Sequence, residues 1–275
     1  MSTKVTRRWR SASMASLLVA MLAGCGLPTA GQPTADPVKA GSAPNRSTTG
    51  GGRPTGVGHF GPSPTPATPV SYPATGGNRW SVAPGETKPG RATGGQLLRY
   101  RVAVERDIQG LPAADIATAI TAILNDPRGW TAGGDWRLRR VGPDDSTDFT
   151  IYLATPGTRD TLCQDIPEGY TSCRNGDKVV LNVARWVKGV PGYGASLATY
   201  RQYMVNHEVG HKLGHGHERC PGQGRSAPVM QQQTLGLHGC TANAWPYPDG
   251  SDRYSGPVGA YDDEIPRREG AYPAH

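Results

Sequence analysis

Four of the chain's seven histidines lie within the eleven residues 207–217. His207 and His211 are four positions apart, so on a helix both imidazoles lie on one face and can bind the same metal ion. Glu208 lies on the flank of that face, where its carboxylate can reach a water molecule bound to the metal. The spacing of these three residues predicts a metal site on a helix, with a general base beside it.

Gly214 and His217 extend this pattern beyond the helix. A glycine can adopt the left-handed conformation that ends a helix, so the chain can turn back and bring His217 to the metal. Three neutral imidazoles and one position open to water are typical of catalytic zinc sites. His215 competes as third ligand, but on a straight helix it lies about 12 Å from His207, too far for two bonds near 2 Å. We therefore expect His217 to bind zinc and His215 to be solvated or to support the ligands.

Residues 207–217 read His-Glu-x-x-His-x-x-Gly-x-x-His, which resembles the signature of the metzincin zinc endopeptidases. Metzincins also carry a turn with a methionine beneath the zinc, and Met230 is the only methionine after the motif. No tyrosine follows Met230 closely, so the fifth ligand of astacin-like members has no match. The resemblance covers most of residues 97–231 and implies specific roles: zinc binding by His207, His211 and His217, base catalysis by Glu208, and a bend at Gly214.

The resemblance implies a zinc-dependent endopeptidase in which Glu208 takes a proton from the zinc-bound water and delivers it to the leaving amine. Residues 179–183 are expected to form the edge strand that pairs with an extended substrate. The tyrosines that could stabilise the transition state are Tyr247, Tyr254 and Tyr261. Two other functions stay open: a zinc hydrolase of cell-wall peptides or amides, and a non-catalytic lipoprotein that binds zinc or a partner on the same scaffold.

Hydrophobic patterns predict the elements that position these residues. Helical spacing of apolar residues after Pro112, with a stop at 125–127, predicts one helix. A longer helix, from near Ala195 to Leu213, carries the motif. This order predicts an α/β (α+β zincin-like) domain with a twisted, mostly parallel sheet and a small loop-rich C-terminal subdomain. Four strands are expected, at 98–104, 136–140, 149–153 and 179–183.

The first 24 residues have the pattern of a signal peptide, with four basic residues followed by a short apolar stretch. The sequence Leu-Ala-Gly-Cys at residues 22–25 resembles the lipobox of bacterial lipoproteins. This resemblance implies acylation of Cys25 and a protein held at the cell membrane, facing the extracellular or cell-wall side. An ordinary secretory signal is the alternative. The whole arrangement is similar to uncharacterised exported actinobacterial lipoproteins with a zinc peptidase domain.

Residues 25–95 are rich in Pro, Gly, Ser and Thr, with 15 Gly and 12 Pro in the 70 residues from position 26. This composition predicts a disordered tether and leaves 96–275 as the metzincin-like domain. The net charge of +7 could indicate a nucleic-acid partner, but residues 96–275 carry 19 basic and 20 acidic residues. We therefore expect a monomer that binds a peptide or protein substrate, no nucleic acid, and the membrane only through its acylated cysteine.

If Cys25 is acylated, four cysteines remain in an exported protein, which predicts two disulfides. Three connectivities are possible. The pairings Cys163–Cys173 and Cys220–Cys240 are favoured because each closes a short loop within one region of the chain.

Overall fold

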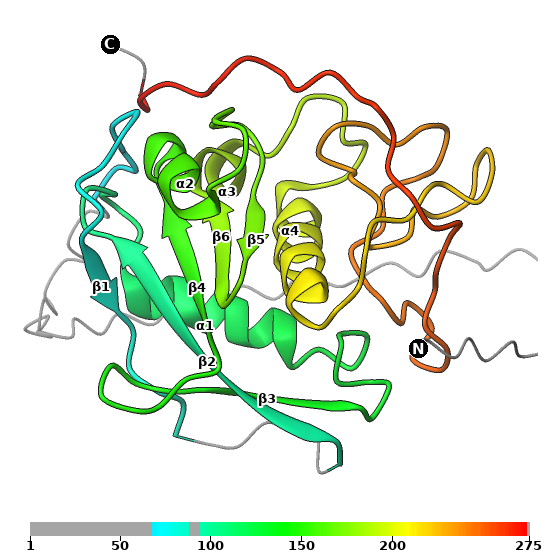
Figure 1. Ribbon diagram of the computed structural model, residues 1–275, viewed down its shortest axis with the longest axis horizontal. Helices are drawn as coiled ribbons and strands as arrows, with labels where there is room; N and C mark the ends of the chain where they lie inside the picture. The colour runs from blue at the N-terminus through cyan, green and yellow to red at the C-terminus, as the bar shows by residue number, and fades with distance from the viewer. Residues whose placement is uncertain (1–67, 88–93, 274–275) are drawn as a thin grey trace, which may run out of the picture. The chain divides into compact units, whose positions relative to one another are not determined.

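The computed structural model describes residues 68–87 and 94–273 (Figure 1). The predicted signal peptide, Cys25 and most of the predicted tether lie outside the described residues. No helix in the described part of the chain is long and apolar enough to cross a membrane.

In the described residues, six strands and four helices form a mixed α/β fold. Each of the four predicted strands and both predicted helices is present, with ends within two residues of those expected. The elements are β1 (Trp80–Val82), β2 (Gln96–Glu105), α1 (Ala113–Leu124), β3 (Trp136–Arg140), β4 (Phe149–Ala154), α2 (Pro156–Cys163), β5 (Cys173–Asn175), β6 (Lys178–Asn182), α3 (Val183–Lys188) and α4 (Leu197–Lys212).

The six strands form one mixed sheet in the order β1-β2-β4-β6-β5, and β3 pairs with the first half of β2. Tyr100 in β2 has a partner on each side, Arg140 in β3 and Phe149 in β4. The β2–β3, β2–β4 and β4–β6 pairs are parallel, whereas β1–β2 and β5–β6 are antiparallel. The predicted α/β class and mostly parallel sheet are therefore confirmed.

The prediction that residues 179–183 form the edge strand is wrong. Val179 in β6 pairs with Ile151 of β4 on one side and with Arg174 of β5 on the other. The interior of β6 is fully buried, as its continuous apolar run requires of a strand covered on both faces. The edge strand beside β6 is β5, which is joined to β6 by a tight turn at 176–177 and has only three residues, too few for an alternating pattern.

The folded domain begins upstream of residue 96, because residues 68–87, assigned above to the tether, include β1. Trp80 of β1 pairs with Glu105 at the end of β2. Glu105 is fully buried, and its carboxylate accepts hydrogen bonds from the backbone of Asn78 at 2.9 Å and Thr155 at 2.8 Å. These bonds satisfy a buried charge that would otherwise be costly, and they join the upstream segment to the sheet.

Two layers cover the sheet, and the alternation of side chains along β6 assigns residues to each. Val179 and Leu181 belong to the main core with α1 and α4, whereas Val180 belongs to a smaller cluster with Cys163 of α2. The motif helix α4 contacts α1, β5 and β6. Packing against the core therefore fixes the position of α4 relative to the edge strand.

The described residues after α4, 213–273, contain no helix or strand, which confirms the predicted loop-rich C-terminal part. Both predicted disulfides are present. Cys163–Cys173 joins the end of α2 to β5, and Cys220–Cys240 closes a loop after the motif.

We expect the double substitution Cys220→Ser with Cys240→Ser to lower the free energy of unfolding by about 2–4 kcal/mol, because the disulfide restricts the unfolded chain. Residues 213–273 contain no helix or strand, so few regular backbone hydrogen bonds compensate for the loss of this disulfide. Urea unfolding of both proteins measures the change. A variant with the same unfolding midpoint as the parent would contradict this expectation.

Candidate metal centre

Helix α4 carries the first part of the motif, and residues at its two ends determine where it begins and ends. The side chain of Ser196 caps its N-terminus by accepting a hydrogen bond from the backbone of Thr199 at 3.1 Å. The helix ends at Lys212, and Gly214 follows with φ of 96°, a conformation that favours glycine. Gly214 thus occupies the predicted bend, and the chain turns back toward the helix to reach His217.

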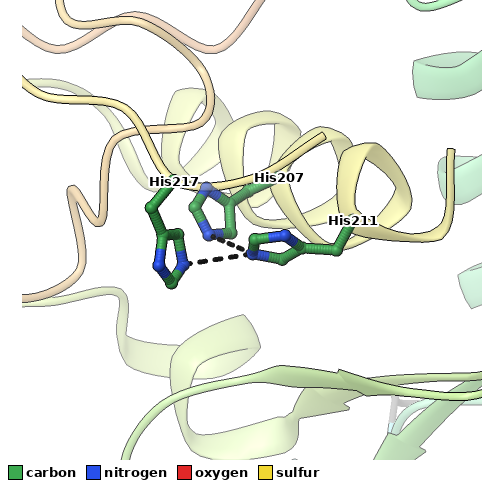
Figure 2. A group of neighbouring side chains, drawn as sticks. All are labelled: His207, His211 and His217. Carbon is green, nitrogen blue, oxygen red and sulfur yellow. Dashed lines mark hydrogen bonds between the residues drawn. The ribbon is translucent and has the colours of Figure 1, made fainter. Parts of the chain in front are cut away.

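The side chains of His207, His211 and His217 converge (Figure 2). The Nε2 atom of His211 lies 3.2 Å from Nε2 of His207 and 3.1 Å from Nε2 of His217. Zinc–nitrogen bonds of 2.0–2.1 Å in a tetrahedral site place ligand atoms about 3.3 Å apart. The spacing of the three nitrogens therefore fits a single zinc ion.

Hydrogen bonds from the opposite ring nitrogens determine which atoms face the metal. Nδ1 of His207 donates to the carbonyl of Val229 and Nδ1 of His211 to the carbonyl of His215, each at 2.8 Å. A carbonyl can only accept, so a neutral ring in this position carries its proton on Nδ1 and presents a lone pair on Nε2. Lone pairs at 3.2 Å cannot hydrogen-bond to each other, and a cation between them satisfies both.

Burial keeps these imidazoles neutral. It lowers the pKa of His207 well below its usual value, and the neighbouring histidines lower it further. Burial also lowers the pKa of His217 to about 4. Neutral imidazole is the form that binds metal, so the site needs no deprotonation near pH 7.

Glu208 lies in the same cavity and has an unusual environment. Its side chain is 6% exposed, and its Oε2 atom has no hydrogen-bond partner among the described residues. Burial raises the pKa of Glu208 to about 8, and the charge of Arg159 opposes this rise. A buried carboxylate without a partner is costly, and such groups are concentrated at functional sites.

Met230 lies beneath the motif helix and is fully buried. Its sulfur and the ring of Trp130 fill the space that a Cβ on Gly210 would need. Gly210 therefore allows α4 to lie close to the turn that contains Met230. The preceding residue, Val229, provides the carbonyl that orients His207.

Sequence reasoning missed Trp130 and Val229. Trp130 stacks on the ring of His215, with centroids 4.5 Å apart, and its Nε1 donates to the carbonyl of Asn206 at 2.8 Å. His215 is thus outside the group of converging nitrogens and supports His211 through its backbone, in keeping with the expectation that it is not a ligand. Neither role has a local sequence signal. Trp130 bonds to Asn206, which is 76 positions away, and Val229 acts through its backbone carbonyl, which every residue has.

A cavity of about 640 Å³ contains this constellation. One side is formed by residues 171–174, which include the start of edge strand β5, and another by Gln232, Thr234 and Leu235. The three candidate tyrosines do not line this cavity. Tyr254 donates its hydroxyl hydrogen to the carbonyl of Ser226, the hydroxyl of Tyr261 accepts a bond from the backbone of Cys220, and Tyr247 lies against Gly133. Their assignment to the transition state therefore lacks structural support.

No curated protein and no solved structure shows a significant match to this chain. A model of a family described as protein of unknown function (DUF3152) matches residues 66–239. The match begins just before the first described residue, contains the motif and Met230, and spans more than half of the chain. The chain therefore belongs to the DUF3152 family of proteins of unknown function.

Proposed function

We propose that this protein is a zinc-dependent endopeptidase with a metzincin-like active site. One observation carries the proposal: the Nε2 atoms of three histidines converge beside the unpartnered carboxylate of Glu208 within a single cavity. The α+β fold, the buried Met230 beneath the helix and the bend at Gly214 agree with it.

The donor set fits zinc, because three neutral imidazoles with an open fourth position are the ligands of many catalytic zinc sites. A zinc ion bound there would polarise a peptide carbonyl and lower the pKa of a water molecule toward 7. Glu208 then accepts the proton of the attacking water on its carboxylate and delivers it to the nitrogen of the leaving amine. The carbonyls of Val229 and His215 keep the imidazoles of His207 and His211 in the tautomer that this requires.

The edge strand β5 is a suitable place for an extended peptide. It pairs with β6 on one side, and its residues Cys173 and Arg174 line the cavity. A peptide can add to such an edge through main-chain hydrogen bonds and place a scissile bond near the three histidines. The disulfide to α2 holds the start of β5 in place.

The environment of Glu208 favours catalysis over metal binding alone. A non-catalytic scaffold gains nothing from a buried carboxylate without a partner, which costs about 1–3 kcal/mol or more. The two disulfides agree with export to an oxidising compartment. Anchoring through acylated Cys25, with the protein on the outer side of the membrane, belongs to the same proposal and rests on the sequence.

Chelation tests the proposal on the full chain. We expect one zinc ion per chain by elemental analysis and hydrolysis of casein that 1,10-phenanthroline abolishes and added zinc restores. Absence of zinc, or hydrolysis that survives complete removal of the metal, would contradict the proposal. Digestion of purified cell wall without digestion of casein would support the alternative wall hydrolase.

A further inference from the structure

The C-terminal segment, defined as residues 261–272, is fixed at both ends. At its start, Tyr261 stacks on His238 with ring centroids 3.5 Å apart, and Asp263 pairs with the same histidine at 2.9 Å. At its end, Tyr272 exchanges two backbone hydrogen bonds with Tyr72, each of 2.8 Å. Figure 1 shows this segment in red as an extended stretch. Anchors on both sides make it a fixed part of the domain.

Between these anchors the segment is joined to the loop 164–171, which lies next to the metal centre. The backbone of Glu269 donates to the carbonyl of Gly169 at 3.4 Å. Arg268 forms an ion pair with Asp160 of α2, whose carboxylate also accepts a hydrogen bond from the backbone of Gly169 at 2.9 Å. Glu269 also forms ion pairs with two basic residues of α3. Residues of both the segment and the loop line the cavity, and we call the two together the outer wall.

Arg159 of α2, which is 2% exposed, contacts the loop 164–171 from the protein interior. Its guanidinium pairs with Asp165 at 2.9 Å and with Glu168 at 2.7 Å. The two acidic side chains of this loop that line the cavity therefore share one guanidinium.

Two isoleucines of the outer wall line the cavity, Ile166 on the loop and Ile265 on the segment. They are 76% and 39% exposed. Only four large hydrophobic side chains are exposed in the described part of the chain, and these are two of them. The cavity therefore presents two exposed apolar side chains that a bound ligand can cover.

We propose that Ile166 and Ile265 determine specificity by binding a large aliphatic or aromatic side chain of the substrate. This inference rests on the proposed function for the identity of the ligand as a peptide. Covering one such side chain gains about 1.5–3 kcal/mol relative to leaving it in water, which corresponds to a preference of about tenfold or more over alanine. The substrate class is therefore peptides or unfolded protein segments with a bulky apolar residue.

The test measures binding separately from cleavage. Fluorescein-labelled hexapeptides of Ser and Ala, with a central Leu, Phe or Ala, are titrated by anisotropy into the zinc-loaded full chain carrying Glu208→Gln. Ile166→Asp and Ile265→Asp are made in this background. Val258→Asp is the matched control, because Val258 is 89% exposed in the same C-terminal part and does not line the cavity. Thermal unfolding verifies that each variant is folded.

We expect the Leu and Phe peptides to bind about tenfold more tightly than the Ala peptide, and this preference to be lost in both isoleucine variants but kept in Val258→Asp. No preference in the parent, or a preference that survives in both isoleucine variants, would overturn the inference. Cleavage by the wild type decides the proposed function independently. If the wild type cleaves peptides but shows no preference for Leu or Phe, the proposed peptidase stands and the apolar binding site is excluded. If the preference is present but the wild type cleaves nothing, the apolar binding site stands and the proposed peptidase is excluded.

Discussion

Replacing Glu208 with glutamine is expected to lower the rate of peptide hydrolysis by about 10²–10⁴-fold, while the protein keeps one zinc ion per chain. The amide has the shape of the carboxylate but cannot accept the proton of the attacking water. Glu208 lies outside the group of converging ligand atoms, so the metal is retained. Elemental analysis and kinetics on the same sample measure both quantities.

The folded state of this variant should not suffer. Oε2 of Glu208 has no partner among the described residues, so the substitution breaks no observed hydrogen bond at that atom. Undiminished hydrolysis would exclude Glu208 as the base. Loss of zinc together with hydrolysis would mean that the residue maintains the site and does not transfer the proton.

His217→Ala is expected to weaken zinc binding by more than about 100-fold, beyond the 10–100-fold typical of losing an outer hydrogen bond to a ligand. His215→Ala is its matched control two positions away. The control removes a ring that stacks on Trp130 but keeps the backbone carbonyl that orients His211. We therefore expect its zinc affinity to fall by less than about tenfold.

Competition with a chromophoric chelator measures both affinities. The two variants show which histidine is the third ligand: His217, which follows the bend at Gly214, or His215, which would be the ligand if the helix continued. Tight binding in His217→Ala with loss in His215→Ala would reverse our assignment of the third ligand.

The motif and the long elements could be predicted because their signals are local. His207 and His211 need only one helical turn to share a face, and Gly214 needs only its own backbone to end the helix. The strand β2 has ten residues and β4 has six, enough for alternation to be visible in the sequence. Each of these features is set by neighbours along the chain.

The edge strand and the transition-state candidates could not be predicted, because partners distant in sequence determine them. β5 has three residues and is a strand only because it pairs with β6, and β1 likewise depends on β2. Helix α2 has eight largely polar residues that begin with Pro156, so hydrophobic periodicity is absent. Closeness in sequence to the motif also did not predict which residues line the cavity. The hydroxyls of Tyr254 and Tyr261 form hydrogen bonds outside the cavity, whereas Ile265, which is farther along the chain, lines it.

The pairing of Tyr72 with Tyr272 affects how well such an enzyme resists digestion by other copies of itself. Under the proposed function every copy of the chain is exposed to digestion by its neighbours, and chain ends are the usual first points of attack. Tyr72 and Tyr272 are joined by two backbone hydrogen bonds and stacked rings, with centroids 5.6 Å apart. A bond near Tyr272 can enter another active site as an extended strand only after this pairing has opened, so self-cleavage there is limited by the population of the opened state. Under the proposed function, this pairing therefore protects the bonds near Tyr272 from autolysis.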